Sequence, residues 1–484
     1  MKPTLDDTIA AISTAPGRAG IAVVRISGPA ARDVARRMGV EDLEPRVVRL
    51  SVVRHPDGGD LDRALVTWFP APGSFTGDDV VEISGHGGSL VPALVLEAAH
   101  AAGARAAEPG EFTRRAYLNG KLDLVQAEAT LDLIDATGEV HHRAALFQLE
   151  GGLSARVTAL RTGVVGLQAL LAYDIDFPEE DDGPVPRERI LEAAGELAAD
   201  LEALVCHAPE GERLAEGAVV VLAGAPNVGK SSIFNSLLGS ERAIVTEIPG
   251  TTRDAIEAAT TVEGFPFRLV DTAGMRDTRE PVERMGIEVA RRSVSRADIV
   301  LLCVETGHEP GAAERELGRE AAAAGARVLH VRTKADLGPD GVVAGSGRTP
   351  EETPKAPATA KPHVSADPTA SGGDGPGSAA EPIQVSVRTA DGLAALRDAL
   401  VETSFAGLRA SREPALVTRK RHTRALGRAL EEIGRFRETF GRGHPAEIAG
   451  THLEEAARAL EELIGITDVE DVLDAIFRSF CVGK

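Results

Sequence analysis

The spacing of apolar residues changes along the chain and predicts parts of different structure. Residues 1–120 mix short β-rich runs, such as Ile21 to Ile26 and Val80 to Ile83, with Gly-rich turns. Runs of this length, bounded by turn residues, are typical of strands. The first part of the chain is therefore predicted to be a compact α+β domain.

A helical pattern replaces the strands over residues 121–215. An acidic run there, Asp174 to Asp182, contains Pro178, which a helix interior excludes, so we expect a loop. Helical periodicity returns over residues 406–484, and the two helical segments are expected to pack together as one all-α domain. The first helix should place four apolar residues on one face, namely Leu124, Ala127, Leu131 and Ile134.

Strands alternate with helices over residues 216–405, between the two helical segments. This alternation is typical of a mostly parallel sheet covered by helices on both faces, and it predicts a domain inserted into the all-α domain. Residues 338–382 are rich in Pro and Gly and almost lack large apolar side chains. Because they cannot offset the entropy lost on ordering, we expect a disordered insertion there. The whole chain is predicted to be a multidomain α/β protein.

Composition narrows the functional classes. A chain of 484 residues with 43% hydrophobic and 26% charged residues should fold into several globular domains. Its cysteines, Cys206, Cys303 and Cys481, suit neither a disulfide framework nor a metal-binding pair, which favours a reducing cytoplasm. No apolar run approaches the roughly 20 residues of a membrane span. A net charge of −21 opposes wholesale nucleic-acid binding, so any RNA contact should be local.

A phosphate-binding motif follows the buried-strand pattern Val219 to Ala223. Residues 224–231 read Gly-Ala-Pro-Asn-Val-Gly-Lys-Ser, which matches the P-loop G-x-x-x-x-G-K-S. Its glycines let backbone N–H groups face phosphate. Lys230 would neutralise the outer phosphates, and the Ser231 hydroxyl would bind Mg²⁺. The competing interpretation is a Gly-rich turn that binds nothing.

Two further motifs follow in the order that a GTPase requires. The run Gly250 to Asp254 contains Thr252, which would complete the Mg²⁺ shell only when a γ-phosphate is present and so makes the loop a switch. A strand pattern over Phe267 to Val270 ends in Asp-Thr-Ala-Gly at residues 271–274. This Asp would reach the metal through water, and the Gly N–H would turn onto the γ-phosphate.

Guanine selectivity is predicted at Thr-Lys-Ala-Asp, residues 333–336, after the strand Val328 to Val331. Asp336 would accept from two guanine nitrogens, which adenine cannot satisfy. GTPases usually carry Asn where Thr333 stands, so we expect altered base affinity with guanine still favoured. A last strand, Ile383 to Val387, leads to the backbone that would meet the guanine oxygen. These motifs together predict a Ras-like P-loop G domain.

The motifs alone do not identify the residue that orients the attacking water. Met275 stands where Ras-type GTPases place a water-orienting Gln. Glu283, shortly downstream, could orient water through a bridge. It could equally occupy the first turn of the next helix, where a carboxylate is favourable.

Further motifs lie outside the predicted G domain. In the first domain they are the runs Thr8 to Ala11, Pro16 to Ile21, Arg25 to Gly28, Glu82 to Gly88, Pro109 to Thr113 and Leu118 to Leu124. The last residues, 480–484, read Phe-Cys-Val-Gly-Lys. Together these motifs resemble the MnmE (TrmE) family of tRNA-modification GTPases, whose members end in Cys-Ile-Gly-Lys, and the resemblance spans nearly the whole chain.

The resemblance implies a GTP hydrolase that forms a heterotetramer with a flavoprotein, MnmG (GidA), which alone binds FAD. Together they would add a carboxymethylaminomethyl group to C5 of the wobble uridine of certain tRNAs. A tetrahydrofolate, in the 5,10-methylene or 5-formyl form, would supply the one-carbon unit. The first domain would also hold a constitutive homodimer, and the G domains would associate transiently when GTP and K⁺ are bound.

Ligand contacts are implied at the positions that match the family motifs. Potassium would be caged by Asn227, Thr246, Ile248 and Thr251, Mg²⁺ would be held by Ser231 and Thr252, and Glu283 would orient water. The predicted GTP contacts are Asn227, Val228, Gly229, Lys230, Ser231, Ser232, Thr246, Glu247, Ile248, Pro249, Gly250, Thr251, Thr252, Asp271, Thr272, Ala273, Gly274, Thr333, Lys334, Ala335, Asp336, Ser386, Val387 and Arg388.

A folate site is likewise implied at Arg25, Glu82, Lys121 and Lys484. The side chains suit a folate, because cations can bind its glutamate tail and a carboxylate can accept hydrogen bonds from the donor edge of its pterin. Each residue alone would more often make a surface ion pair. His86, flanked by glycines, is interpreted as a turn histidine and left out of the site.

Three alternatives stay open. Cys481 could be a nucleophile or redox thiol, or could simply pack. The basic run Arg419 to Arg424 could touch tRNA phosphates or be a solvated helix face. The chain could also be a regulatory switch of the ribosome-assembly type, whose flanking domains only bind partners; such a switch has no reason to bind 5-formyltetrahydrofolate.

Overall fold

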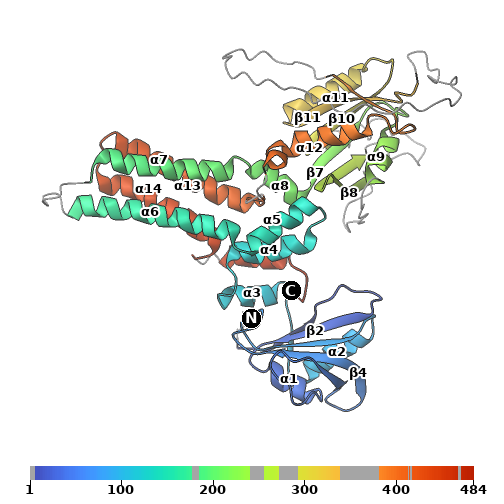
Figure 1. Ribbon diagram of the computed structural model, residues 1–484, viewed down its shortest axis with the longest axis vertical. Helices are drawn as coiled ribbons and strands as arrows, with labels where there is room; N and C mark the ends of the chain where they lie inside the picture. The colour runs from blue at the N-terminus through green and yellow to red at the C-terminus, as the bar shows by residue number, and fades with distance from the viewer. Residues whose placement is uncertain are drawn as a thin grey trace, which may run out of the picture. The chain divides into compact units, whose positions relative to one another are not determined.

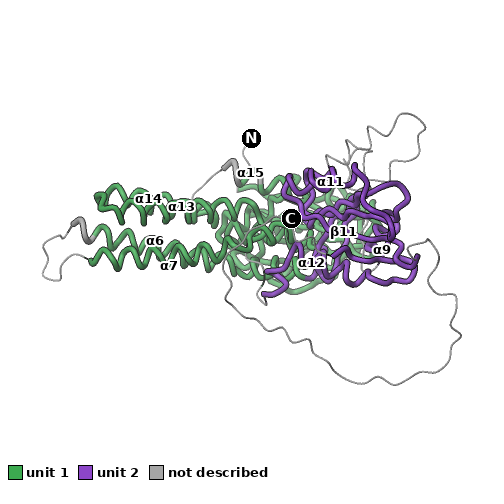
Figure 2. The backbone as a smooth tube through the Cα atoms, turned by 90° about the horizontal axis from the view of Figure 1, so that it is seen from above, with its two compact units in different colours: residues 1–136, 140–215, 413–484 green, residues 137–139, 216–412 purple. Residues whose placement is uncertain are grey.

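The chain folds into two compact units in a computed structural model (Figures 1 and 2). Unit 1 contains residues 1–136, 140–215 and 413–484, and unit 2 contains residues 137–139 and 216–412. Unit 2 thus interrupts unit 1 in the sequence, which confirms the predicted insertion of one domain into another. The structure describes residues 6–176, 185–239, 256–271, 293–337, 381–411, 414, 417–466 and 470–483.

The first part of unit 1 is the predicted α+β domain. Its strands are β1 (Ile9–Ile12), β2 (Ile21–Ser27), β3 (Arg49–Arg54), β4 (Asp60–Phe69), β5 (Val80–His86) and β6 (Arg105–Ala106), with helices α1 (Ala31–Arg37), α2 (Val91–Ala101) and α3 (Glu111–Leu118). They form one sheet in the order β3-β4-β5-β2-β1-β6, in which only β1 and β6 are parallel. Helices α1 and α2 bury one face of this sheet.

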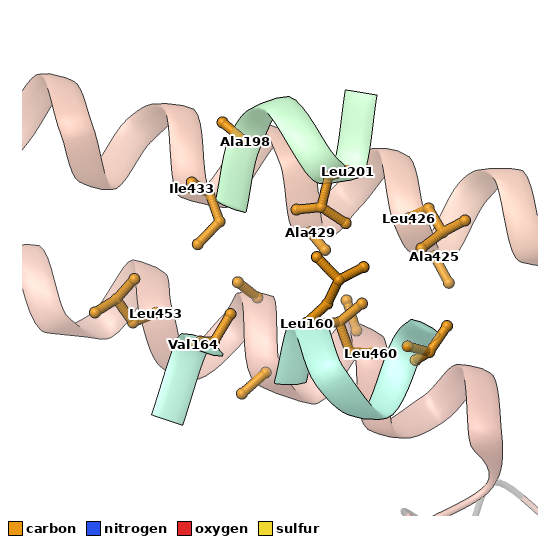
Figure 3. Packing of buried hydrophobic residues seen from close by; sticks show 14 of the residues in the cluster. Leu160, Val164, Ala198, Leu201, Ala425, Leu426, Ala429, Ile433, Leu453 and Leu460 are labelled. Atoms are coloured by element: carbon orange, nitrogen blue, oxygen red, sulfur yellow. The ribbon is translucent and has the colours of Figure 1, made fainter. Parts of the chain in front are cut away.

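The rest of unit 1 is helical, and both of its chain segments contribute. The first segment forms α4 (Leu124–Asp135), α5 (Glu139–Leu149), α6 (Gly152–Asp176), α7 (Arg187–Val205) and α8 (Ala208–Glu216); the second forms α13 (Lys420–Gly441), α14 (Ala446–Ile464) and α15 (Glu470–Arg478). Helices α6, α7, α13 and α14 lie side by side and share one apolar core (Figures 1 and 3). Among the described residues, no helix is long and apolar enough to cross a membrane.

Leu124, Ala127 and Leu131 of α4 are buried against α15, and Ile134 of the same helix is 41% exposed. One detail of the helical prediction is wrong. Asp174 and Asp176, expected in the acidic loop, lie in the last turns of α6. The helix extends this far because Pro178 disfavours helical structure only at its own position and just before it. Residues 177–184 lie outside the described residues.

The described residues of unit 2 form an α/β domain with six strands. They are β7 (Ala218–Ala223), β8 (Ile256–Val262), β9 (Phe265–Asp271), β10 (Ile299–Glu305), β11 (Arg327–Thr333) and β12 (Ile383–Val385), with helices α9 (Lys230–Leu238), α11 (Ala312–Ala323) and α12 (Leu393–Ala410). The sheet order is β12-β11-β10-β7-β9-β8, and only β8 runs antiparallel to its neighbour. Of the predicted insertion 338–382, all but the last two residues lie outside the described residues.

Helix α12 carries unit 2 beyond the predicted boundary at residue 405. Phe405 itself is fully buried, and its ring stacks on Phe265 at 4.8 Å and meets Phe267 edge-on at 5.6 Å. Both partners belong to β9. This aromatic contact attaches the second half of α12 to the sheet of unit 2.

Candidate functional site

The P-loop joins β7 to α9. Gly224 ends the strand with a φ of +141°, and a side chain there would overlap the carbonyl of Cys303 on β10. The loop then enters α9 at Lys230 through Gly229, whose φ is +104°. The two positions accept only glycine, so the loop curls tightly in front of a helix N-terminus, as phosphate binding requires.

Lys230 and Ser231 begin α9 and face different partners. Lys230 is 5% exposed, and its Nζ donates to the carbonyls of Gly224 at 2.9 Å and Ala225 at 2.8 Å. The Ser231 hydroxyl donates to Asp271 Oδ2 at 2.8 Å. Asp271 ends β9, which pairs with β7, so neighbouring strands bring the two predicted metal-site groups together. A hydroxyl and a carboxylate are oxygen ligands that suit Mg²⁺.

The predicted guanine site gathers around Asp336. Its Oδ1 accepts from the Ser386 hydroxyl at 2.7 Å, and Arg388 lies 3.7 Å from its Oδ2. The Ser386 hydrogen bond, aided by the charge of Arg388, holds the pKa of Asp336 below its usual value, so it stays an acceptor. Ala335 N donates to the Val385 carbonyl at 3.2 Å, which holds the two predicted base-binding segments side by side. Strand β12 ends two residues before the predicted end, because Ser386 N bonds to the Asp391 carbonyl.

Thr333 links the base site to the P-loop. It is 2% exposed, and its hydroxyl donates to the carbonyl of Val228. The neighbouring Lys334 pairs with Glu305 Oε2 at 2.9 Å. Glu314 of α11 accepts from the N–H of Ala225 at 2.9 Å. The motifs did not indicate either glutamate, although Glu314 lies in the first turn of α11, where its Oε2 accepts from the N–H of Gly311.

The remaining predicted nucleotide contacts divide into two groups. Asn227, predicted to contact potassium, is exposed with a φ of 62°; Val228 is buried and Ser232 exposed. The switch segments lie outside the described residues, so the roles of their residues stay predictions. They are Thr246, Glu247, Ile248, Pro249, Gly250, Thr251, Thr252, Thr272, Ala273, Gly274 and Glu283.

Two of the four predicted folate residues lie in the first domain, and a third, Lys121, directly follows it. Arg25 and Glu82 are cross-strand partners on β2 and β5, and Arg25 Nε donates to Glu82 Oε1 at 2.9 Å. The Arg25 guanidinium also lies 5.8 Å from the ring of Phe75. Lys121 Nζ donates to the Pro72 carbonyl at 3.1 Å. Because Phe75 and Pro72 belong to one loop, that loop lies against both the Arg25 pair and Lys121.

The C-terminal tail docks on this domain. Ser13 Oγ donates to the Gly483 carbonyl at 3.0 Å, and Val482 forms a β-bridge with Pro109. Gly483 has a φ of +100°, and a side chain there would overlap the Ile12 carbonyl. Lys484 follows outside the described residues. Cys481 is exposed, so the interpretation that it simply packs is wrong.

Three members of the basic run 419–424 pair with carboxylates of α4. Arg421 and His422 bond to the buried carboxylate of Glu128 on α4, at 2.6 and 2.7 Å, and Arg419 pairs with Asp132 at 2.5 Å. His422 is fully buried. These contacts join α13 to α4, while the side chains of Arg419 and Arg421 keep 25% and 23% of their surface exposed.

Two family models match the chain and together span almost its whole length. The model described as the GTP-binding protein TrmE N-terminus matches residues 8–121, and that of the MnmE helical domain matches residues 124–481. A tRNA modification GTPase MnmE from Azoarcus sp. (strain BH72) is 41% identical over 100% of this chain and 99% of its own. Proteins of the same name are 39% identical in Neisseria gonorrhoeae (strain NCCP11945) and 42% identical in Methylobacterium radiotolerans, each over 99% of both chains.

Solved structures align with less of the chain. The G domain of the T. maritima FeoB iron transporter is 22% identical and covers 39% of this chain and 98% of its own, with a TM-score of 0.25. A score this low has no bearing on fold or activity. From its family models and its full-length relatives, the chain belongs to the MnmE (TrmE) family of tRNA modification GTPases.

Proposed function

We propose that this chain hydrolyses GTP and, with a flavoprotein partner, adds a carboxymethylaminomethyl group to C5 of the wobble uridine of certain tRNAs. The observation that carries the proposal is the 41% identity, over the full length of both chains, to a protein named as a tRNA modification GTPase. A 5,10-methylene- or 5-formyltetrahydrofolate would supply the one-carbon unit.

The P-loop arrangement supports GTP as the substrate. Lys230 is held beside the loop by carbonyls, which a phosphate can replace as the partner of its ammonium group. Ser231 would bind Mg²⁺ directly, with Asp271 behind it and Thr252 completing the shell. Asp336, kept ionised by Ser386, would select guanine.

For the hydrolytic step we assign Glu283 to orient the attacking water. K⁺ would be held by Asn227, Thr246, Ile248 and Thr251. It would supply positive charge beside the phosphates in place of an arginine finger, whose effect on the rate is about 10³ to 10⁵.

Replacing K⁺ by Na⁺ should therefore lower turnover far more than GTP affinity. Asn227→Ala should reproduce this loss in K⁺, and Glu283→Ala should abolish turnover while sparing K⁺-dependent pairing of G domains. Equal turnover in the two salts contradicts the assignment.

We assign the folate to Arg25, Glu82, Lys121 and Lys484. The pair of Arg25 with Glu82 offers both a donor and acceptors to a heterocycle, and the tail that ends in Lys484 docks on the same domain. Lys121 adds a cation at the neighbouring loop. The domain roles we propose are folate binding and dimerisation for residues 1–120, GTP hydrolysis for 216–405, and a supporting helical domain for 121–215 and 406–484.

The partners we propose follow the same reasoning. The chain would act as a cytoplasmic homodimer, in a heterotetramer with the flavoprotein that carries FAD, on tRNA. Mass spectrometry of wobble uridines from cells with and without this gene tests the reaction; unchanged modification overturns it. Binding of 5-formyltetrahydrofolate distinguishes it from a regulatory switch, because a switch has no reason to bind folate.

A further inference from the structure

The peptide group between Gly224 and Ala225, at the start of the P-loop, is held from both sides. Its carbonyl oxygen, on Gly224, accepts from Lys230 Nζ at 2.9 Å, and its N–H, on Ala225, donates to Glu314 Oε1 at 2.9 Å. This peptide is trans and planar, so its C=O and N–H point in opposite directions. Lys230 and Glu314 together therefore fix which way the peptide group faces.

Glu314 uses its two carboxylate oxygens for different contacts. Its Oε2 accepts from the N–H of Gly311, the residue that precedes the first turn of α11. A glutamate at the third position of a helix commonly closes the helix end in this way. The cap needs one oxygen only. The contact of Oε1 with the N–H of Ala225 is therefore additional to the capping role, and it joins α11 to the P-loop.

The packing of α11 holds Glu314 close to the P-loop. Ala321 of α11 is fully buried in the core of unit 2, and Leu317 packs against the same cluster. This cluster also contains Ala223, the last residue of β7, and Leu302 of β10. The helix that carries Glu314 and the strand that leads into the P-loop thus share one core, which keeps the contact in place without help from a nucleotide.

Exposure separates an effect on phosphate binding from an effect on folding. Ala225 is exposed, so water can accept from its N–H when Glu314 is replaced, and the free energy of unfolding should change little. The orientation of the peptide group is what its loss would release. If the peptide turns over, its carbonyl leaves Lys230, whose side chain is buried and depends on backbone carbonyls in the P-loop.

We propose that Glu314 is a positioning residue for the phosphates of GTP. By fixing the peptide group between Gly224 and Ala225, it keeps the Lys230 ammonium group in the P-loop before the nucleotide binds. A group that is already in place loses less conformational freedom on binding, which raises affinity. Glu314 acts through the loop and the lysine. The inference rests on the proposed use of GTP and adds a residue that lies outside the nucleotide-binding motifs.

Competition against fluorescent GDP, with the full-length chain, tests this role. The probes are GDP, which has the β-phosphate that a P-loop lysine binds, and GMP, which lacks it. Glu314→Ala should weaken GDP binding by about two- to tenfold, the range of one net hydrogen bond, and leave GMP affinity unchanged. Glu314→Asp should do the same, because it keeps the charge but is one methylene too short to reach from Gly311 to Ala225. Glu314→Gln keeps the reach and an acceptor oxygen, so it should restore part of the GDP affinity.

Glu316→Gln is the matched control, since it removes an exposed carboxylate of the same helix, paired with Arg319 at 2.8 Å, and should bind both probes as the wild type does. Glu314→Ala with wild-type GDP affinity overturns the inference. Equal losses for GDP and GMP would show a general loosening of the site and overturn it as well. If Glu314→Gln binds GDP no better than Glu314→Asp, reach to the P-loop has no effect and the inference is wrong. A wild type that binds neither GDP nor GTP overturns the proposed substrate itself.

Discussion

Thr333 stands where GTPases usually carry Asn, and its side chain makes a contact with the P-loop. Its only side-chain proton is donated to the P-loop carbonyl of Val228, and its own carbonyl accepts from Thr306 N at 3.0 Å. The hydroxyl therefore has no second proton for a base. In the proposed function, base recognition would fall on Asp336, while the hydrogen bond of Thr333 joins its loop to the P-loop.

Thr333→Val should weaken GTP and GDP binding to a similar extent, by roughly three- to tenfold, because a net hydrogen bond of about 0.5–1.5 kcal/mol is lost. The preference for guanine over adenine should not change, since Asp336 is untouched. Titration with fluorescent GDP, competed by GTP and ATP, measures both quantities. Thr333→Ser keeps the hydroxyl and is the control. A variant that loses guanine preference would show that Thr333 reads the base itself.

The nucleotide site could be predicted from sequence where a motif fixes backbone and side chain together. Ser231 with Asp271, and Asp336 with Ser386, come together as their motifs imply. Glu314 could not be assigned, because its contact with the P-loop depends on how α11 packs beside β10 and not on any local pattern.

At the scale of elements, a buried ionic cluster attaches α13 to α4. Glu128 is 1% exposed and accepts from Arg421 and His422. Arg421 also donates to the carbonyls of Glu462 and Leu463 at the end of α14. The cluster therefore fixes the start of the second helical segment on the first. Periodicity predicted these helices, but the partners are too far apart in sequence for any pattern to pair them.

Glu128→Gln should lower the free energy of unfolding by about 3–5 kcal/mol, because it leaves the buried His422 and the partly buried Arg421 without their counter-ion. Urea denaturation of unit 1, followed by circular dichroism, measures the loss. Glu431→Gln removes one partner of an exposed pair with Arg435 and should cost less than about 1 kcal/mol. A similar loss of stability in both variants would mean that the buried cluster contributes no more than an exposed ion pair.

The same cluster predicts how stability depends on pH. Burial alone would raise the pKa of Glu128, but His422 and Arg421 hold it well below its usual value. A carboxyl with a lowered pKa contributes stability above its unfolded pKa of about 4.3, and that contribution is lost as pH falls below it. The stability difference between wild type and Glu128→Gln should therefore be full at pH 6 and shrink from pH 4.5 downwards. A difference that grows on acidification contradicts the assignment.

At the scale of the molecule, the last residues of the chain complete its first domain. Deleting residues 481–484 removes the contacts of Gly483 with Ser13 and of Val482 with Pro109. Folate binding should weaken, whereas GTP affinity should stay as in the wild type. Cys481→Ser is the control and should bind folate normally, since its thiol is exposed. Unaffected folate affinity in the deletion would remove the tail from the site.

Because unit 2 separates the two helical segments in the sequence, the helical bundle cannot be completed until late in synthesis on the ribosome. Leu160 of α6 and Leu201 of α7 leave the ribosome before unit 2, but Ile433 and Leu460, which cover them, follow it. At roughly 5–20 residues per second, synthesis of the roughly 200 intervening residues takes on the order of 10–40 s. For that time the nascent chain presents an uncovered apolar helix pair, a surface that chaperones bind. Chains that terminate inside unit 2 keep this surface permanently, so we expect them to aggregate or be degraded even when their GTP-binding fold is intact.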